Sequence, residues 1–314
     1  MARIPLRLRI AIGCFSLLVL LYMIRDFWPE KYILELPAVS VQYESKPYNE
    51  SKVALLVETR ALPQLAPFIL HMISVVPPDW RFRFMGSNVS IPHLNNSVAI
   101  RHQVEIGKLD LTYVPSNVSV DTIEHLNEFY TNLWVYETVL QPAEWILSYQ
   151  TDSMLCANSK GNLNDWLEYD WVGAPWSLDA RYGGNGGLSL RRASAIIQVL
   201  RNQRRLPNSD PEDVWLSERL GHRRGGSVAN GTASLQFSAE QHWTEYPMGY
   251  HTGGSGIFLS PWVWGTPAMR QHIYDYCPEI KLVLDMDVAS YMPGECGLDT
   301  WKRDENALMG DGDY

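Results

Sequence analysis

A glycine-rich stretch followed by a pair of acids is the part of the sequence best suited to chemistry. Residues 181–192 read R-Y-G-G-N-G-G-L-S-L-R-R, with four glycines around Asn185, and residues 211–216 read P-E-D-V-W-L. Glycines such as Gly186 and Gly187 let the backbone approach a ligand that a side chain would block. A neighbouring carboxylate, from Asp213 or Glu212, is suited to take a proton from a hydroxyl group. The alternative is structural, because such glycines form turns and such acids cap helices.

Polar residues also follow two predicted buried strands. Residues 53–57 and 145–149 are continuous apolar runs, typical of strands covered on both faces of a parallel sheet. The first run leads into Glu58, Thr59 and Arg60, and the second leads into T-D-S at Asp152. Open α/β sheets bind ligands at the carboxyl ends of their strands. We therefore predict a ligand site at this edge, with a turn or cap as the alternative role of Asp152.

Helices and a further strand are predicted between and after these runs. Residues 62–75 and 193–200 have the pattern of helices, and residues 81–85 that of a second strand. The segment 121–140 has the clearest helical pattern in the chain, with Asp121 at its predicted N-cap and Glu124 three residues later. Strand, helix and strand in this order indicate a mainly parallel α/β sheet.

Two later residues are candidates for the site, and each has both a binding and a structural interpretation. Asp170 lies in the aromatic segment Y-D-W-V-G-A-P-W, where it either binds a sugar hydroxyl or caps a turn. His251 follows Y-P-M-G-Y, and as a neutral imidazole it would suit Mn²⁺, although a lone histidine is commonly structural.

Several of these motifs, in this order, resemble a known family. V-E-T-R, Q-T-D-S, Y-D-W-V-G-A-P-W, the glycine-rich stretch and E-D-V, together spanning about residues 53–252, are similar to a fungal glycosyltransferase-like family known as domain of unknown function 5672. G-N-G-G-L-S-L-R with a downstream E-D-V also resembles inverting glycosyltransferases of the GT-A fold.

The resemblance implies a fold and a set of roles. The fold would be GT-A-like, a Rossmann-like nucleotide-diphospho-sugar transferase domain with a mixed, mainly parallel sheet. Asp152 and His251 would hold Mn²⁺ or Mg²⁺ against the donor diphosphate. Asn185, Gly186 and Gly187 would form the floor under the sugars, with Glu58, Thr59, Arg60 and Asp170 as further substrate-binding residues. Asp213, or less readily Glu212, would be the general base. T-D-S departs from the Asp-x-Asp motif of such enzymes, because it supplies one carboxylate.

The N-terminus predicts a membrane anchor. Arginines precede an apolar run, and residues 6–24 are expected to form a type II signal anchor with a lumenal body, in the Golgi or endoplasmic reticulum. A cleaved signal peptide is the alternative. The predicted divisions are 1–28 for the cytoplasmic end and anchor, 29–51 for a stem, 52–265 for the catalytic domain, and 266–314 for a helix-like segment and polar tail.

Sequons and cysteines agree with a lumenal environment. Five asparagines are predicted glycosylation sites, namely Asn49, Asn88, Asn95, Asn117 and Asn230. Outside the anchor, Cys156, Cys277 and Cys296 permit one disulfide, and the predicted pair is Cys277 with Cys296.

Composition limits the classes of partner. The net charge of −9 argues against nucleic-acid binding, which requires a basic face. The expected partners are a nucleotide-diphospho-sugar, a glycan or glycoprotein acceptor, and a membrane. Two other functions remain open at this point: an inactive lectin-like or scaffold protein of the same fold, and a glycoside hydrolase that uses Asp152 and Asp213.

Overall fold

The computed structural model describes residues 6–27, 48–254 and 259–284. The chain divides into two units, Met1–Ser45 and Lys46–Tyr314. Most of the predicted stem and the C-terminal tail, with Cys296, therefore lie outside the described residues.

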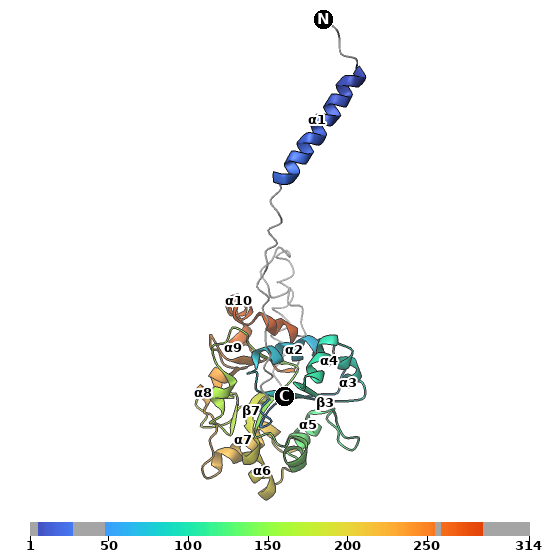
Figure 1. Cartoon of the computed structure of the whole chain (residues 1–314). Helices are drawn as coiled ribbons and strands as arrows, with labels where there is room; N and C mark the ends of the chain where they lie inside the picture. The colour runs from blue at the N-terminus through green and yellow to red at the C-terminus, as the bar shows by residue number, and fades with distance from the viewer. Residues whose placement is uncertain (1–5, 28–47, 255–258, 285–314) are drawn as a thin grey trace, which may run out of the picture. The chain divides into compact units, whose positions relative to one another are not determined.

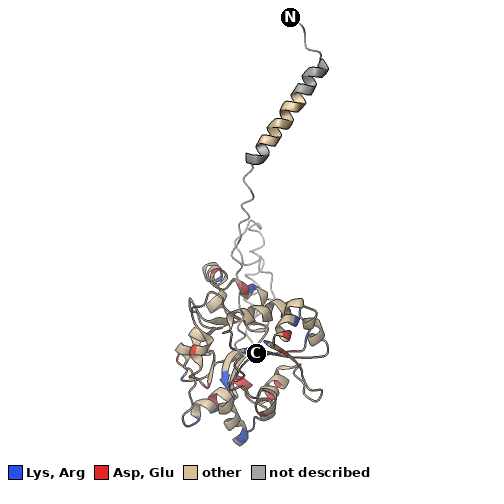
Figure 2. Ribbon diagram, viewed as in Figure 1, with Lys and Arg blue, Asp and Glu red and all other residues tan. Residues whose placement is uncertain are grey.

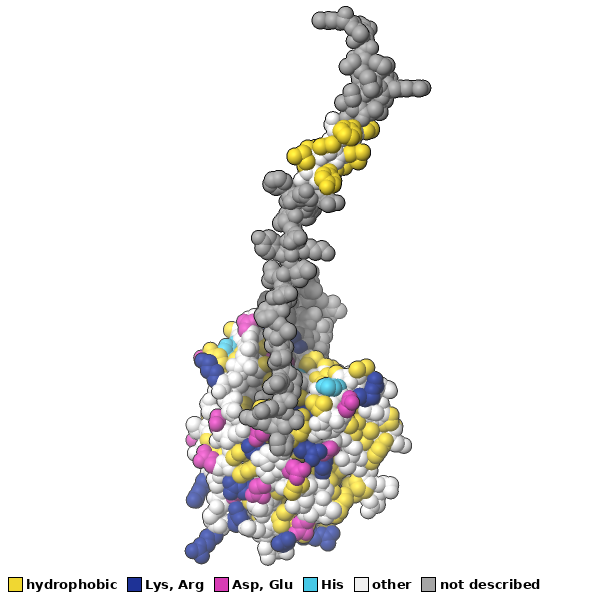
Figure 3. Space-filling model, viewed as in Figure 1, with side chains coloured by type: hydrophobic (Ala, Val, Ile, Leu, Met, Phe, Trp, Pro, Cys, Tyr) yellow, Lys and Arg dark blue, Asp and Glu magenta, His cyan; other side chains and the backbone are white. Residues whose placement is uncertain are grey.

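The first unit contains one helix, α1 (Leu6–Phe27), of 22 residues. Its side chains from residue 13 to residue 23 are exposed, and Figure 3 shows apolar side chains among them. Across residues 6–27, 48–254 and 259–284, no helix combines the length and the hydrophobicity that a membrane crossing requires.

The second unit is built on a six-stranded mixed sheet in the order β3-β2-β1-β4-β7-β6 (Figure 1). Its strands are β1 (Lys52–Glu58), β2 (Arg81–Gly86), β3 (Leu109–Tyr113), β4 (Trp145–Tyr149), β6 (Trp171–Ala174) and β7 (Asn185–Arg192). β1, β2, β3 and β4 are parallel to one another, and β7 is antiparallel to both β4 and β6. The prediction of a mixed, mainly parallel sheet is confirmed.

Helices connect and cover these strands. They are α2 (Leu65–Val75), α3 (Ser90–Asn95), α4 (Val98–Glu105), α5 (Ile123–Tyr130), the π-helical turn η1 (Val135–Val139), the 3-10 turn η2 (Leu163–Trp166), α6 (Ala193–Asn202), α7 (Glu212–His222), α8 (Gly231–Phe237), α9 (Pro261–Trp264), α10 (Pro267–Tyr276) and η4 (Pro278–Leu282). In Figure 1, α2 and α10 lie on one side of β7, and α5, α6 and α7 lie on the other. Acidic and basic residues are interspersed along the ribbon of this unit (Figure 2).

The sheet separates two hydrophobic cores. Ala54 and Leu56 of β1 pack with α2, α8 and α10, whereas Val53 and Leu55 pack with α5, α6 and α7. This alternation follows from the two-residue period of a strand. It also explains the continuous apolar run that predicted β1, because both of its faces are buried.

A second, three-stranded sheet lies beside the first, in the order β5-β9-β8. Its strands are β5 (Ser153–Leu155), β8 (Ser238–Ala239) and β9 (Gly249–His251). Immediately after β5, Cys156 forms a disulfide with Cys277. The predicted pairing of Cys277 with Cys296 is therefore wrong, because the chain brings Cys277 to the end of β5.

The predicted helix over residues 121–140 is instead broken in two, into α5 and the π-helical turn η1. α5 begins after Thr122, whose hydroxyl accepts a hydrogen bond from the His125 amide, so Thr122 is the N-cap in place of Asp121. The helix ends at Tyr130 because Thr131 donates its hydroxyl hydrogen to the Asn127 carbonyl and Asn132 accepts from the Trp134 amide. Side chains that bond to nearby backbone compete with the helix.

Candidate functional site

The predicted site residues, apart from Asp170, lie at one edge of the main sheet. β4 ends at Tyr149, and the antiparallel β7 begins beside it, with Tyr149 opposite Leu188. The Gln150 amide then donates to the Gly187 carbonyl at 2.8 Å. Because β1 is parallel to β4, Glu58 also ends its strand at this edge. The carboxyl ends of β1 and β4 and the start of β7 therefore form one surface.

Asp152 and His251 are brought together by the second sheet. β5 and β9 are antiparallel with Ser153 opposite His251, and the Thr252 amide donates to the Asp152 carbonyl at 2.9 Å. The Asp152 Oδ1 atom lies 3.4 Å from His251 Nε2, and both residues are less than a tenth exposed. Two residues distant in the sequence thus share one buried position, as the sequence predicted.

Glu240 completes this cluster, although no sequence motif marked it. Its Oε1 lies 3.4 Å from His251 Nδ1, on the side of the ring opposite Asp152. The parallel pairing of β8 with β9 places it there, since Glu240 directly follows β8. Burial disfavours the protonated ring, but the two carboxylates outweigh burial and raise the pKa of His251 to about 10.

Gly187 supports the cluster from below. A Cβ at Gly187 would lie 2.2 Å from His251 Nε2 and 2.8 Å from Gln150 Oε1. Only a glycine permits this approach, which is the reason for the second glycine of the pair. The same distances show that the side chain of Gln150, which the sequence reading left without a role, lies beside the His251 ring.

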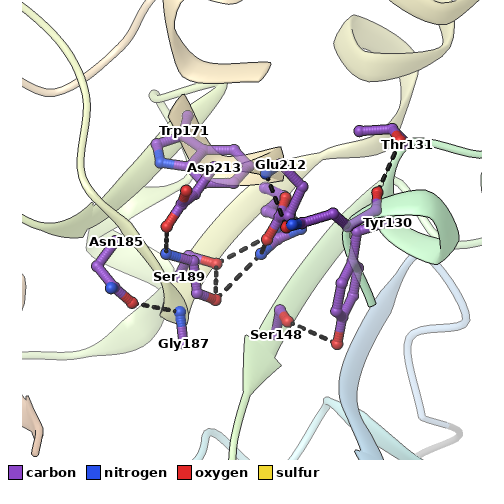
Figure 4. Close-up of polar contacts among 12 residues, drawn as sticks. Tyr130, Thr131, Ser148, Trp171, Asn185, Gly187, Ser189, Glu212 and Asp213 are labelled. Carbon is purple, nitrogen blue, oxygen red and sulfur yellow. Dashed lines mark hydrogen bonds and ion pairs between the residues drawn. The ribbon is translucent and has the colours of Figure 1, made fainter. Parts of the chain in front are cut away.

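Gly186 contacts a second polar cluster (Figure 4). Its amide donates to Asp213 Oδ2 at 2.9 Å, while the Asp213 Oδ1 atom accepts from the Val214 amide. A Cβ at Gly186 would lie 2.4 Å from Glu212 Oε1. Asp213 thus has a fixed orientation next to the glycine floor, at the first turn of α7.

Glu212 has a structural environment instead of a catalytic one. Arg191 donates to both of its carboxylate oxygens, at 2.8 and 3.1 Å, and both side chains are buried. The Arg191 guanidinium lies over the rings of Trp171 and Tyr130, with its Cζ 4.4 and 4.6 Å from their centroids. Burial raises the pKa of Glu212 to about 7, although Arg191 opposes the shift. This pair fixes the start of α7, because Arg191 also donates to the Gly186 carbonyl.

Asn185 closes the turn before the glycine pair. Its Oδ1 accepts from the Gly187 amide at 2.6 Å, as Figure 4 shows. Its side chain therefore shapes the floor and holds Gly187 in place.

Glu58 and Arg60 form a second charged group at this edge. The buried Glu58 carboxylate accepts three hydrogen bonds from Arg60, one from the amide and two from the guanidinium, at 2.6–2.9 Å. The hydrogen bond to Glu58 and the nearby charge of Asp152 raise the pKa of Arg60. Arg60 is therefore a cation at the edge, whereas Thr59 contributes its carbonyl to Ser87.

A cavity of about 590 Å³ lies beside Arg60. It is lined by Arg60, Leu62, Pro63, Gln64, Thr151, Leu282, Val283 and Leu284. It combines a cation with apolar and amide groups, which suits a ligand that carries both a charged and an uncharged part.

Asp170 has a structural role, the second of its two interpretations, and not a sugar-binding one. Its carboxylate is fully buried and accepts from Arg223 at 2.7 Å and from the Ser227 amide at 3.0 Å, with Arg192 at 3.1 Å. These contacts join β6 to the segment after α7. The expectation that Asp170 binds substrate is not supported, because no surface of this carboxylate is available to a sugar.

Asp152 and His251 could fill two coordination positions of one divalent ion. Its Oδ1 and His251 Nε2 face each other at 3.4 Å, and neither His251 nitrogen makes a hydrogen bond in the described part of the chain. Carboxylate oxygen and the nitrogen of a deprotonated imidazole both suit Mn²⁺, so a bound ion would displace the proton that the raised pKa keeps on His251, and the Glu240 carboxylate would orient the ring. Within residues 6–27, 48–254 and 259–284, no group of three or more His, Cys, Asp or Glu is arranged to hold a metal. Further ligands would therefore come from substrate and water.

All five predicted glycosylation asparagines are exposed. Asn230 is also the N-cap of α8, where its Oδ1 accepts from the Ala233 amide.

Similar solved structures are glycosyltransferases by their titles. The glycosyltransferase GlyE of Streptococcus pneumoniae TIGR4 is 11% identical, with a TM-score of 0.46, over 82% of this chain and 64% of that one. A mannosyltransferase of Pyrobaculum calidifontis, in complex with GDP-Man and Mn²⁺, is 10% identical, with a TM-score of 0.41, over 57% and 54%. The galactosyltransferase LgtC is 14% identical, with a TM-score of 0.40, over 71% and 96%. The chain thus spans between about half and two thirds of the length of the first two.

Sequence comparison gives one family match. No curated protein matches the chain. The matched region begins later in the chain than the expected residues 53–252, so V-E-T-R lies outside it. Residues 108–251, which contain Asp152, Asp213 and His251, match the family described as protein of unknown function DUF5672.

Proposed function

We propose that this protein is a membrane-anchored glycosyltransferase that moves a sugar from a nucleotide-diphospho-sugar to a glycan or glycoprotein acceptor in the secretory pathway. One observation carries the catalytic part of the proposal: at the carboxyl edge of a mixed α/β sheet, His251 and Asp213 lie against the glycine pair, and Asp152 faces His251. Open α/β sheets bind their ligands at this edge. The anchor and the lumenal location rest on the sequence pattern of residues 6–24 and on the sequons.

The Glu58–Arg60 pair and the Asp152–His251 pair would each contact the donor diphosphate in a different way. Arg60, held by Glu58, offers a fixed cation to the diphosphate, and its guanidinium is suited to phosphate oxygens. Asp152 and His251 would hold Mn²⁺ or Mg²⁺, which neutralises the charge of the leaving diphosphate when it is bound. The glycine pair, with no side chains, lets Glu212 and His251 pack directly against the backbone beside the proposed donor site.

Asp213 is the proposed general base. In the reaction, the acceptor oxygen bonds to the anomeric carbon as that carbon loses its bond to the diphosphate, which leaves with the electron pair. The acceptor proton passes to the Asp213 carboxylate. Attack from the side opposite the leaving group would invert the anomeric configuration.

Asp213→Asn tests this assignment. With a panel of UDP- and GDP-sugars and a mixed glycan acceptor, the release of nucleoside diphosphate should fall by about 10²-fold or more, while donor binding remains. Glu218→Gln, on the same helix, is a matched control. Turnover retained in Asp213→Asn would contradict the assignment.

A specific observation also favours a second function, a lectin-like protein of the same fold. Asp152 supplies one carboxylate where GT-A enzymes have two, and no three-residue metal group occurs among the described residues. Such a protein would bind sugars without binding nucleotides.

A further inference from the structure

A second cavity adjoins the His251 cluster through Glu240. It measures about 620 Å³, and its lining includes Trp176, Glu240, His242, Gly253, Ser260 and Trp262. Trp262, in the first turn of α9, is 76% exposed, although it is one of the largest apolar side chains. An exposed indole at the wall of a cavity is a surface on which a ligand ring can stack.

Glu240 connects this cavity to the cluster at His251. Its Oε1 faces His251 Nδ1 at 3.4 Å, whereas its Oε2 is buried and accepts no hydrogen bond from any described residue. A buried carboxylate oxygen without a donor is costly. Since Glu240 also lines the cavity, a rotation of its carboxylate would turn this oxygen towards a ligand hydroxyl there, which would supply the missing hydrogen bond.

The charges of the two cavities select different ligands. The cavity beside Arg60 contains a cation, as a diphosphate requires. Among the described residues, the lining of the Trp262 cavity contains a carboxylate and no lysine or arginine, which disfavours an anion. An aromatic face, a carboxylate and a histidine are instead the groups that a neutral saccharide uses, with its ring on the indole and its hydroxyls on the polar atoms.

We propose that the Trp262 cavity is the acceptor subsite and takes a neutral saccharide, with the sugar ring on Trp262 and a hydroxyl donated to Glu240. This proposal rests on the proposed glycosyltransferase function. In it, Glu240 links the two halves of the site, because the same carboxylate contacts the donor-side histidine and the acceptor.

The test is saturation-transfer NMR with the full chain in a sugar-free detergent. The probes are neutral methyl glycosides of galactose, mannose, glucose and N-acetylglucosamine. At least one should receive saturation from the protein, with affinity about tenfold weaker in Trp262→Ala. Glu240→Gln, which keeps the side-chain shape, should weaken binding by about tenfold or more. Trp134→Ala removes a partly exposed indole elsewhere and should bind as the wild type does.

Parallel thermal shifts with UDP and GDP in the presence of Mn²⁺ separate the two proposals. No saturation of any glycoside, or equal saturation in all variants, contradicts the subsite even where a nucleotide stabilises the protein. Saturation that depends on Trp262 and Glu240, without stabilisation by either nucleotide, supports the cavity and contradicts the transferase. Because Trp262 is largely exposed, its replacement should leave the fold intact. Circular dichroism of each variant checks this.

Discussion

His251 and Gln150 lie so close to the α-carbon of Gly187 that this residue determines the geometry of the donor side. In Gly187→Ala, the new methyl group would overlap His251 Nε2 and Gln150 Oε1, so the ring must move away from Asp152. We expect a loss of about 1–3 kcal/mol in the free energy of unfolding, typical of overpacking, and a loss of nucleotide binding. Urea unfolding and nucleotide thermal shifts measure the two effects.

Gly161→Ala is the matched control for this variant. A Cβ at Gly161 would have its nearest neighbour at 3.5 Å, which is an ordinary contact. Nucleotide binding should be unchanged there. Wild-type binding in Gly187→Ala as well would show that the position of His251 does not matter to the site.

At this scale the sequence predicted which residues approach each other better than it predicted their roles. Asp152 and His251 were paired from a family pattern, and the structure brings them together. Glu212 and Asp170 were expected to face substrate, but they are buried against arginines. Glu240 was missed because only the β8 and β9 pairing brings it to His251. Burial and sheet pairing depend on segments that are distant in the sequence, so a local motif gives no information about either.

At the scale of elements, the Arg191 and Glu212 pair joins β7 to α7. In Arg191→Met, Glu212 would be left buried without a counter-charge, and we expect a loss of about 3–5 kcal/mol in the free energy of unfolding. The double variant Arg191→Met with Glu212→Gln removes the stranded charge and should recover part of this loss. Urea unfolding of the single and double variants measures it, and additive losses would contradict the coupling.

A second ion pair links α5 to the segment before α7. Arg205 donates to both oxygens of Glu124 at 2.8 Å, and its hydrogen bonds lower the pKa of Glu124 to about 2. Because the folded-state pKa lies below the unfolded value of 4.5, the pair stabilises the fold above pH 4.5 and loses this effect as the pH falls towards 2.

Glu124→Gln tests this pH dependence. The variant should be less stable than the wild type at pH 6, and the difference should shrink below pH 4.5 and vanish near pH 2. Unfolding by urea across this range gives the measurement, with Glu218→Gln as the control. A difference that is constant with pH would exclude the ionised carboxylate as its cause.

Elements were predicted well where local pattern decides them. The buried runs gave β1 and β4 because strands covered on both faces are apolar throughout. The predicted helix over 121–140 is interrupted after Tyr130. Its apolar spacing continues past this residue, but the side chains of Thr131 and Asn132 bond to the backbone and end α5. Periodicity does not report such local competition.

At the scale of the whole molecule, the Cys156–Cys277 disulfide ties the end of β5 to the C-terminal helices across 121 residues. Its reduction, or the double change Cys156→Ser with Cys277→Ser, should lower the free energy of unfolding by about 2–5 kcal/mol. Cys14→Ser should have no effect, since Cys14 is free and exposed. Thermal unfolding with and without a reductant gives the comparison, and equal melting temperatures would contradict a structural bond.

The central claim is that the edge formed by Asp152, His251 and the glycine pair binds a nucleotide diphosphate with a divalent ion. The most direct measurement is the thermal shift of the full chain with UDP or GDP, with and without Mn²⁺, in the wild type and in Asp152→Asn. Asp179→Asn, an exposed aspartate in the same unit, is the control. We predict stabilisation by one nucleotide that requires Mn²⁺, reaches about 2.7 kcal/mol at a hundredfold excess over Kd, and is lost only in Asp152→Asn. No stabilisation by either nucleotide in the folded wild type, or equal stabilisation in Asp152→Asn, would contradict the claim.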